Sequence, residues 1–168
     1  MRFTPLTAPD LPLVTTWRAA PHVSRWLGPA PTEEQVAAKY LPRIRGEVPT
    51  RCFLAWHEGA PFAFVQGYRA ADHPVWAAVC GLGADVAGLD LFIGEPGHLG
   101  RGIGAATIDG FVTTVLLTWP GIDASAANPL SSNVASVRAF ARAGFTPMRE
   151  IHDPADLRPS VLLLRQGR

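Results

Sequence analysis

A glycine-rich segment contains the residue types that point most directly to chemistry. Gly100, Gly102 and Gly104 alternate in Leu99-Gly100-Arg101-Gly102-Ile103-Gly104, after a predicted turn and before a predicted helix. Glycines let backbone N–H groups approach an anion closely, and the first N–H groups of a helix add partial positive charge. The segment therefore suits a pyrophosphate, to which Arg101 adds a charge. The alternative is a tight structural turn.

Two common phosphate-binding motifs do not match this segment. Ala105 occupies the place of the last glycine in the dinucleotide-binding G-x-G-x-x-G motif. The Gly-Lys-Ser/Thr ending of a P-loop does not follow either. Spacing alone therefore indicates an anion-binding loop and leaves its ligand open.

Predicted strands and a helix must position the glycine segment. Residues 89–93 form a predicted strand that carries the acidic Asp90, and residues 94–99 form a turn. After the glycines, apolar residues recur at helical spacing until Pro120 ends the run. Residues 121–126 are the next predicted strand. The segment thus joins a strand to a helix.

The N-terminal half predicts helices followed by a hairpin. Thr32 and Gln35 have capping-box spacing and start a helix that should end near Pro42. The strands expected here are residues 2–6, 52–56 and 61–68, the last two joined by a glycine-containing turn. Residues 69–87 show no clear period, so we expect a loop or an irregular strand there.

The C-terminal part predicts one short helix and two strands. Asn133 opens the helix, with Val134, Val137 and Ala141 on one side, and Gly144 closes it. The last two strands are expected at residues 145–151 and 160–164. This order of elements predicts an α+β fold in a single domain, residues 1–168.

Composition excludes several classes of protein. The 168 residues are 48% apolar and 17% charged, with a formal net charge of +1, which argues against disorder and against nucleic-acid binding by a dense basic field. No membrane-length apolar run and no signal peptide is visible. Cys52 and Cys80 suggest neither disulfides nor a metal, and the histidines lack ligand spacing. We therefore expect a cytoplasmic protein without a metal site or a membrane partner.

A second motif, from Asn133 to Phe145, indicates the protein family to which the glycine segment could belong. Asn133, followed by Phe140-Ala141-Arg142-Ala143-Gly144-Phe145, resembles the N-x-x-(A/S)-x-x-x-Y-x-x-x-G-F element of the GNAT acetyltransferases. The resemblance implies a mixed, mostly antiparallel central sheet flanked by helices, with acetyl-CoA (CoA) as cofactor. The cofactor-binding residues that it implies are Leu91, Phe92, Ile93, Leu99, Gly100, Arg101, Gly102, Ile103, Gly104, Asn133 and Phe140.

Among the GNAT proteins, the sequence is similar to the aminoglycoside 6′-N-acetyltransferases over nearly its whole length. The stretches that carry this likeness are residues 22–28, 39–42, 64–68, 88–90 and 99–104. Leu99, at the first place of the glycine segment, is typical of that branch. The likeness implies direct transfer of acetyl to an amine of a small polycationic substrate.

Asp90 is the catalytic base that the resemblance implies. Acetyl transfer needs a neutral amine, a group that removes its proton and hydrogen-bond donors for the oxyanion. A carboxylate with an ordinary pKa of about 4 is a weak base, so a raised pKa or a water relay would help. The backbone N–H groups of residues 91–93 are the expected oxyanion donors. An aspartate bonded to a neighbouring loop is the alternative interpretation.

Two residues depart from the family pattern. Phe140 stands where a tyrosine commonly protonates the leaving thiolate, and Tyr68 is the candidate substitute. Asn128 stands where the aminoglycoside branch has an aspartate that meets the drug. The expected substrate-binding residues are Trp26, Gln66, Tyr68, Asp85, Asp90 and Asn128, with Glu95 as a further acid. Trp26 also fits an ordinary partly buried aromatic.

Three hypotheses remain from the sequence. In the first hypothesis the protein acetylates an aminoglycoside. In the second it also uses acetyl-CoA, but the acceptor is a siderophore precursor, a polyamine or a protein N-terminus. The third hypothesis is a non-catalytic CoA-binding sensor, which Phe140 favours and Asp90 opposes. An exposed apolar strand edge would in addition favour a homodimer.

Overall fold

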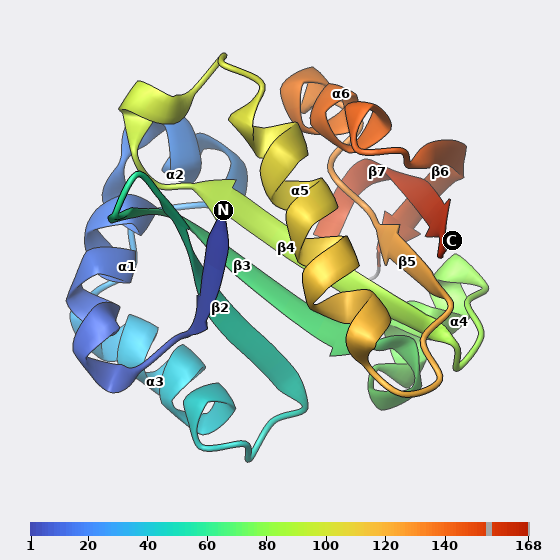
Figure 1. Ribbon diagram of the computed structural model, residues 1–168, viewed down its shortest axis with the longest axis horizontal. Helices are drawn as coiled ribbons and strands as arrows, with labels where there is room; N and C mark the ends of the chain where they lie inside the picture. Colours follow the sequence, from blue (N-terminus) through green and yellow to red (C-terminus); the bar gives the residue numbers. More distant parts are fainter. Residues whose placement is uncertain (154–155, 168) are drawn as a thin grey trace. The chain divides into compact units, whose positions relative to one another are not determined.

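The computed structural model describes residues 1–153 and 156–167, and within them seven strands form one mixed sheet (Figure 1). Their order is β1-β2-β3-β4-β5-β7-β6, with β4 and β5 parallel. The chain divides into two compact units, Met1–Gln66 with Asp90–Arg101 and Gly67–Leu89 with Gly102–Arg168. Strands β3 (Ala60–Arg69) and β4 (Val86–Ile93) each contribute residues to both units. The predicted α+β class with a mixed sheet is confirmed.

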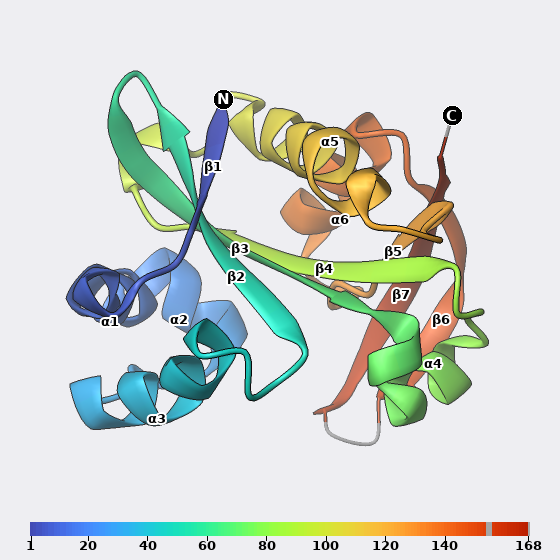
Figure 2. The same cartoon turned by 60° about the horizontal axis from the view of Figure 1, so that its bottom comes forward.

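The first unit begins with an antiparallel pair and a hairpin. Strand β1 (Arg2–Pro5) pairs with β2 (Thr50–His57), and β3 follows β2 after two residues. These residues, Glu58 and Gly59, both have positive φ, 49° and 82°, as a type I′ hairpin turn requires. The helices of this unit are α1 (Leu11–Ala19), α2 (Pro21–Leu27) and α3 (Glu33–Ile44), which lie together beside the strands in Figure 2. Short 3₁₀ turns lie at Ala8–Asp10 and Pro96–His98.

Helix α3 is fixed at its start and buried on one side. The Thr32 side chain accepts a hydrogen bond from the Gln35 N–H at 3.2 Å, and the Gln35 side chain accepts one from the Thr32 N–H at 2.9 Å, so the predicted capping box is confirmed. The helix ends at Ile44, close to Pro42 as predicted. The core of the unit contains Leu6, Leu11, Val14, Trp17, Val36, Tyr40, Cys52, Leu54 and Phe64.

The second unit has its last strand in the middle of its sheet. Strand β7 (Asp156–Gln166) pairs antiparallel with both β5 (Ala124–Ala127) and β6 (Thr146–Asp153). In Figure 2, helices α5 (Ile103–Thr114) and α6 (Val134–Arg142) lie on one side of β5 and β7, and α4 (Pro74–Cys80) lies on the other. Short 3₁₀ turns lie at Ala70–Asp72 and Leu116–Thr118.

One local prediction is wrong. The expected loop or irregular strand at 69–87 contains helix α4, which Pro74 begins and which ends before Gly81 at φ 65°. This helix is short, so its period is too brief to be read from the sequence. On the predicted helix α6, Phe140 is buried, whereas Val134 is 51% exposed and Ala141 is exposed.

No helix within residues 1–153 and 156–167 combines the length and the apolar character that crossing a membrane requires.

Candidate active site

Asp90 is an exposed carboxylate on a strand whose preceding residues are buried. It follows Val86–Leu89, all buried, on β4. Its Oδ2 accepts a hydrogen bond of 2.7 Å from Nε2 of Gln66 on β3. Two residues away on each strand, the rings of Phe64 and Phe92 stack with centroids 5.2 Å apart. Cross-strand pairing therefore aligns Gln66 with Asp90, and the structure brings these two predicted residues together.

A third residue, which sequence analysis missed, extends this contact. Nη1 of Arg43, in the last turn of α3, donates a hydrogen bond of 2.6 Å to Oε1 of Gln66. Arg43 also lies over the ring of Tyr40, at 5.5 Å from its centroid. A single sequence does not reveal the row Arg43–Gln66–Asp90. Which helix residue meets which strand residue depends on how α3 packs against β3.

Positive charges and burial shift the pKa values of groups around this row. Burial, and after it the charges of Arg43 and Arg18, lower the pKa of Lys39, while the charge of Asp90 opposes them. Burial raises the pKa of the Cys52 thiol from 9.0 to about 11, and the charge of Arg43 partly offsets this. Asp90 thus lies near Lys39, on which the charges of Arg43 and Arg18 also act.

The end of β4 is held by side chains from α1 and α2. Nε2 of His22 lies 3.0 Å from the carbonyl oxygen of Ile93. Nε1 of Trp17 donates a hydrogen bond of 2.8 Å to Glu95, and the Trp17 ring lies against Gly94, where an added Cβ would overlap it. Glu95, a candidate substrate acid, is therefore bonded to Trp17. The predicted residues Leu91, Phe92 and Ile93 are partly buried on this part of the strand.

Two glycines of the glycine segment adopt left-handed backbone conformations and have open space beside them. Gly100 and Gly102 have φ of 73° and 77°, and a Cβ added at either would meet nothing within 4 Å. Gly102 is the N-cap of α5, and its carbonyl accepts hydrogen bonds from the N–H groups of Ala105 and Ala106. Such open glycines before a 12-residue helix fit a pyrophosphate. Leu99 and Arg101 are exposed within the segment.

Helices α5 and α6 approach closely near the glycine segment. A Cβ added at Gly104 would lie 3.7 Å from Cβ of Ala139 on α6. Asn133 caps α6, because its Oδ1 accepts a hydrogen bond of 3.2 Å from the Ser136 N–H. Phe140 is buried, with its ring 5.1 Å from that of Phe145. Both predicted residues thus stabilise α6 and its connection to β6.

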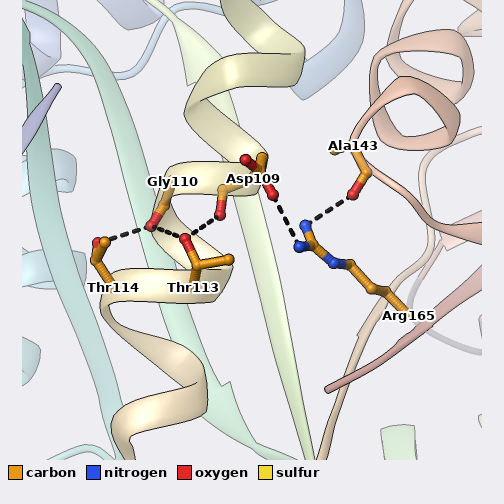
Figure 3. Close-up of polar contacts among 6 residues, drawn as sticks. All are labelled: Asp109, Gly110, Thr113, Thr114, Ala143 and Arg165. Atoms are coloured by element: carbon orange, nitrogen blue, oxygen red, sulfur yellow. Dashed lines mark hydrogen bonds and ion pairs between the residues drawn. The ribbon is translucent and has the colours of Figure 1, made fainter. Parts of the chain in front are cut away.

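Arg165 links both helices to β7 (Figure 3). Its Nη2 lies 2.8 Å from Oδ1 of Asp109 on α5, and its Nη1 donates a hydrogen bond of 2.7 Å to the carbonyl of Ala143, the C-cap of α6. The Arg165 side chain is 11% exposed. One guanidinium therefore fixes the position of α5, which begins at the glycine segment, relative to α6.

An aromatic group in the second unit includes Tyr68 and contacts Asn128, two further candidate residues. Nε1 of Trp76 donates a hydrogen bond of 2.9 Å to Oδ1 of Asn128. The Tyr68 ring contacts Trp76 and His73 edge-on, at 5.1 and 4.7 Å, and Gly88 lies beneath it with no room for a Cβ. The structure thus joins Tyr68 and Asn128 through Trp76. Sequence analysis missed Trp76 because it treated that region as a loop.

The remaining candidates are Asp85 and Trp26, one in each unit. Asp85 is exposed at the start of β4, with its carboxylate against Gly83. Trp26 is partly exposed on α2, where the Arg25 guanidinium lies 4.7 Å from the centre of its ring.

Comparison with known proteins agrees with these features. The family model described as acetyltransferase (GNAT) domain matches residues 7–153. An aminoglycoside N(6′)-acetyltransferase type 1 of Klebsiella pneumoniae is 25% identical over 154 residues, covering 89% of this chain and 75% of that protein.

Solved structures share the fold. A structure of AAC(6′)-Ib in complex with paromomycin and acetyl-CoA has a TM-score of 0.85 at 23% identity, covering 98% of this chain and 92% of that one. A complex of AAC(6′)-Ib with coenzyme A and kanamycin has a TM-score of 0.84 at 22% identity, covering 98% and 93%. Because the family model spans most of the sequence, and the fold and glycine segment agree with it, this chain belongs to the acetyltransferase (GNAT) domain family.

Proposed function

We propose that this chain transfers the acetyl group of acetyl-CoA to an amine of a polycationic, aminoglycoside-like substrate. The observation that carries the proposal is an exposed Asp90, oriented by Gln66, on the strand that leads into the open glycine segment. The names of the relatives support the donor and the class of acceptor. We further propose that residues 1–168 act as one acetyltransferase domain, which the match over residues 7–153 supports.

The glycine segment is the part that would hold acetyl-CoA. Backbone N–H groups at Gly100–Gly104 and at the start of α5 would bind the pyrophosphate, because glycine leaves their approach open. Arg101 would add a charge-assisted contact. When bound, acetyl-CoA supplies an activated acetyl thioester.

Asp90 would hold the attacking amine and accept its proton. An exposed carboxylate attracts an ammonium group and can take a proton from it directly or through water. The backbone N–H groups of Leu91–Ile93 would donate to the oxygen on which negative charge develops.

Tyr68 is the proposed proton donor to the leaving thiolate. Phe140 has no hydroxyl, so it cannot take this part. Tyr68 is 9% exposed, and the contacts of its ring with Trp76 and His73 restrict its rotation. If Tyr68 donates this proton, Tyr68→Phe will lower kcat with little change in the KM for acetyl-CoA. An unchanged kcat would instead assign the proton to solvent.

The first test is release of the CoA thiol from acetyl-CoA in the presence of kanamycin, ribostamycin, spermidine or lysine. Turnover with an aminoglycoside supports the proposal, and Asp90→Asn should lower that kcat roughly 100- to 10,000-fold. Asp123→Asn is the matched control, because it removes the same charge from an exposed aspartate that is not among the proposed site residues. Equal losses in both variants would count against Asp90 as the base.

A second test concerns the cofactor. Gly102→Val should abolish acetyl-CoA binding measured by calorimetry, because the side chain blocks the approach of the pyrophosphate to the backbone. Gly121→Val is the matched control, since Gly121 also has positive φ, 72°, with nothing within 4 Å of an added Cβ. Equal affinities in the two variants would remove the glycine segment from the cofactor site.

A second candidate acceptor is a less charged amine. Asn128 offers no charge to a second ammonium group, and Trp76 already binds its carbonyl oxygen. Asn128→Asp keeps an acceptor for Trp76 and adds a negative charge. If Asn128→Asp lowers the KM for kanamycin and leaves the KM for lysine unchanged, the acceptor is an aminoglycoside whose binding Asn128 weakens. An unchanged KM for both moves the choice to the smaller amine.

A further inference from the structure

Three side chains of the first unit form a continuous row of hydrogen bonds that ends on the proposed base. Arg43 donates to Oε1 of Gln66 at 2.6 Å, and Nε2 of Gln66 donates to Oδ2 of Asp90 at 2.7 Å. The three residues come from α3, β3 and β4. The row therefore connects a helix to the reacting group through one amide.

The chemistry of the end groups determines how this amide is oriented. A guanidinium can only donate hydrogen bonds, and a carboxylate can only accept them. The Gln66 amide has one end of each kind, so a single orientation satisfies both neighbours. Without Arg43, the amide loses the partner that holds its oxygen away from Asp90. The opposite orientation would place two oxygen acceptors against each other.

Packing on the same faces of α3 and β3 fixes Arg43. Tyr40, three residues earlier on the helix, packs on Phe64 with ring centroids 5.1 Å apart. Phe64 precedes Gln66 by two residues, so both side chains lie on the same face of β3. Tyr40 and Arg43, three residues apart, likewise lie on the same face of α3, so each helix residue meets one strand residue. Tyr40 and Phe64 are both buried. The helix thus brings the guanidinium to the amide through a rigid aromatic contact.

We propose that Arg43 is a positioning residue for acetyl transfer, acting through Gln66 to hold the Asp90 carboxylate in one orientation. This inference rests on the proposed function of Asp90. Arg43 does not contact the reacting atoms in this role, so its loss should affect kcat for the amine and leave the affinity for acetyl-CoA unchanged. We expect Arg43→Met to lower kcat roughly 10- to 100-fold, a modest loss for a group that acts through another.

Matched variants separate positioning from general loss of charge. Arg45→Met removes the same charge two residues later, from a side chain that is 62% exposed and paired with Glu47 on the surface, and should leave kcat unchanged. Arg43→Lys keeps one donor and should restore part of the loss. Gln66→Glu keeps an acceptor for Arg43 but cannot donate to Asp90 when ionised, so it should be at least as impaired as Gln66→Met.

The decisive kinetic experiment is a double-mutant cycle. If Arg43 acts through Gln66, Arg43→Met will add no further loss of kcat in the Gln66→Met background. Independent losses that multiply would overturn the inference. Thermal unfolding of each variant identifies any that fail to fold, and Arg43→Leu, which also lacks a donor, then replaces Arg43→Met in the cycle.

A spectroscopic measurement tests the row without turnover. The side-chain NH₂ resonance of Gln66, assigned with Gln66→Met, should show the downfield shift of a donor to a carboxylate in the wild type and in Arg45→Met. It should lose that shift in Asp90→Asn and in Arg43→Met. A shift retained in Arg43→Met overturns the positioning role. Absence of turnover with every amine, with the shift behaving as expected, overturns the proposed function and leaves the role of Arg43 in orienting Asp90 standing.

Discussion

The row at Asp90 and the aromatic group at Trp76 hold the proposed site residues by different physical means. In the first unit, Arg43 and Asp90 are charged ends of a hydrogen-bonded row, and the carboxylate remains exposed. In the second unit, Tyr68 packs by its ring against Trp76, which holds Asn128 by one neutral hydrogen bond. Tyr68 is 9% exposed.

This difference teaches which property each region controls. A row of charge-assisted hydrogen bonds orients a group that must still meet water and substrate. Close ring packing gives a fixed shape, and it depends on a complete fit. Substitutions in the first region should therefore act mainly on turnover, and those in the second should act mainly on stability.

Of the variants proposed below, Gly88→Ala should lose the most stability. A Cβ at Gly88 would overlap the Tyr68 ring and lie 2.8 Å from Trp76, so the ring group must move. We expect a loss of about 3 kcal/mol in the free energy of unfolding, measured in urea. Gly97→Ala is the control, because nothing lies within 4 Å of its added Cβ. Equal stabilities of the two variants would mean that the aromatic group rearranges to accept the methyl group. The second region would then not depend on close packing.

Arg165→Met comes next. It removes the ion pair with Asp109 and leaves the Ala143 carbonyl without this donor, which should cost about 2–3 kcal/mol. Acetyl-CoA affinity should fall with it, because α5 begins at the glycine segment. Arg45→Met, which breaks a 3.9 Å surface pair with Glu47, should cost below about 1 kcal/mol. A small loss in Arg165→Met would show that packing alone holds α5 and α6.

The pH dependence of stability tests the burial of Cys52 in the first unit. Its thiol has a pKa raised to about 11, so the folded state binds its proton more tightly than the unfolded chain does. The resulting stability is complete below about pH 9 and is lost as pH rises through 11. By pH 11 the wild type should lose about 2 kcal/mol that Cys52→Ala does not lose. Parallel pH profiles from urea unfolding would contradict the raised pKa.

A pair of tryptophan variants gives the smallest effect and the sharpest comparison. Trp76→Phe removes the bond to Asn128, and Trp56→Phe removes the 2.8 Å bond to Thr4 in the first unit. Each should cost about 1 kcal/mol of stability. Trp76→Phe alone should change the KM for the amine, since Asn128 is a proposed substrate residue. The same KM change in Trp56→Phe would show that the effect is indirect.

The sequence predicted those elements that have clear local signals. The Thr32–Gln35 box, the glycine turn between β2 and β3 and the Asn133 cap are visible as residue types at fixed spacing. Two motifs in the right order predicted the GNAT family, which the family model confirms. Helix α4 escaped because its seven residues are too few to show a period, although Pro74 and Gly81 marked both ends.

Contacts between distant elements were beyond the sequence. Gln66 and Asp90 were each expected at the site, but their hydrogen bond follows from strand register. Arg43 and Trp76 gave no local signal, because their roles depend on how α3 and α4 pack. The substrate and cofactor roles of individual residues stay predictions, as does the homodimer, which size-exclusion chromatography with light scattering would test.

The position of β7 between β5 and β6 has a consequence for synthesis of the chain. A ribosome makes β5, α6 and β6 before it makes β7, the strand that pairs with both β5 and β6. Until then β5 lacks its β7 neighbour, and Arg165 has not yet reached Asp109 or Ala143. Helix α5 is therefore held only by its earlier partners during translation. The contacts of Arg165 with Asp109, in the middle of α5, and with Ala143 therefore form after nearly all of the second unit has been made.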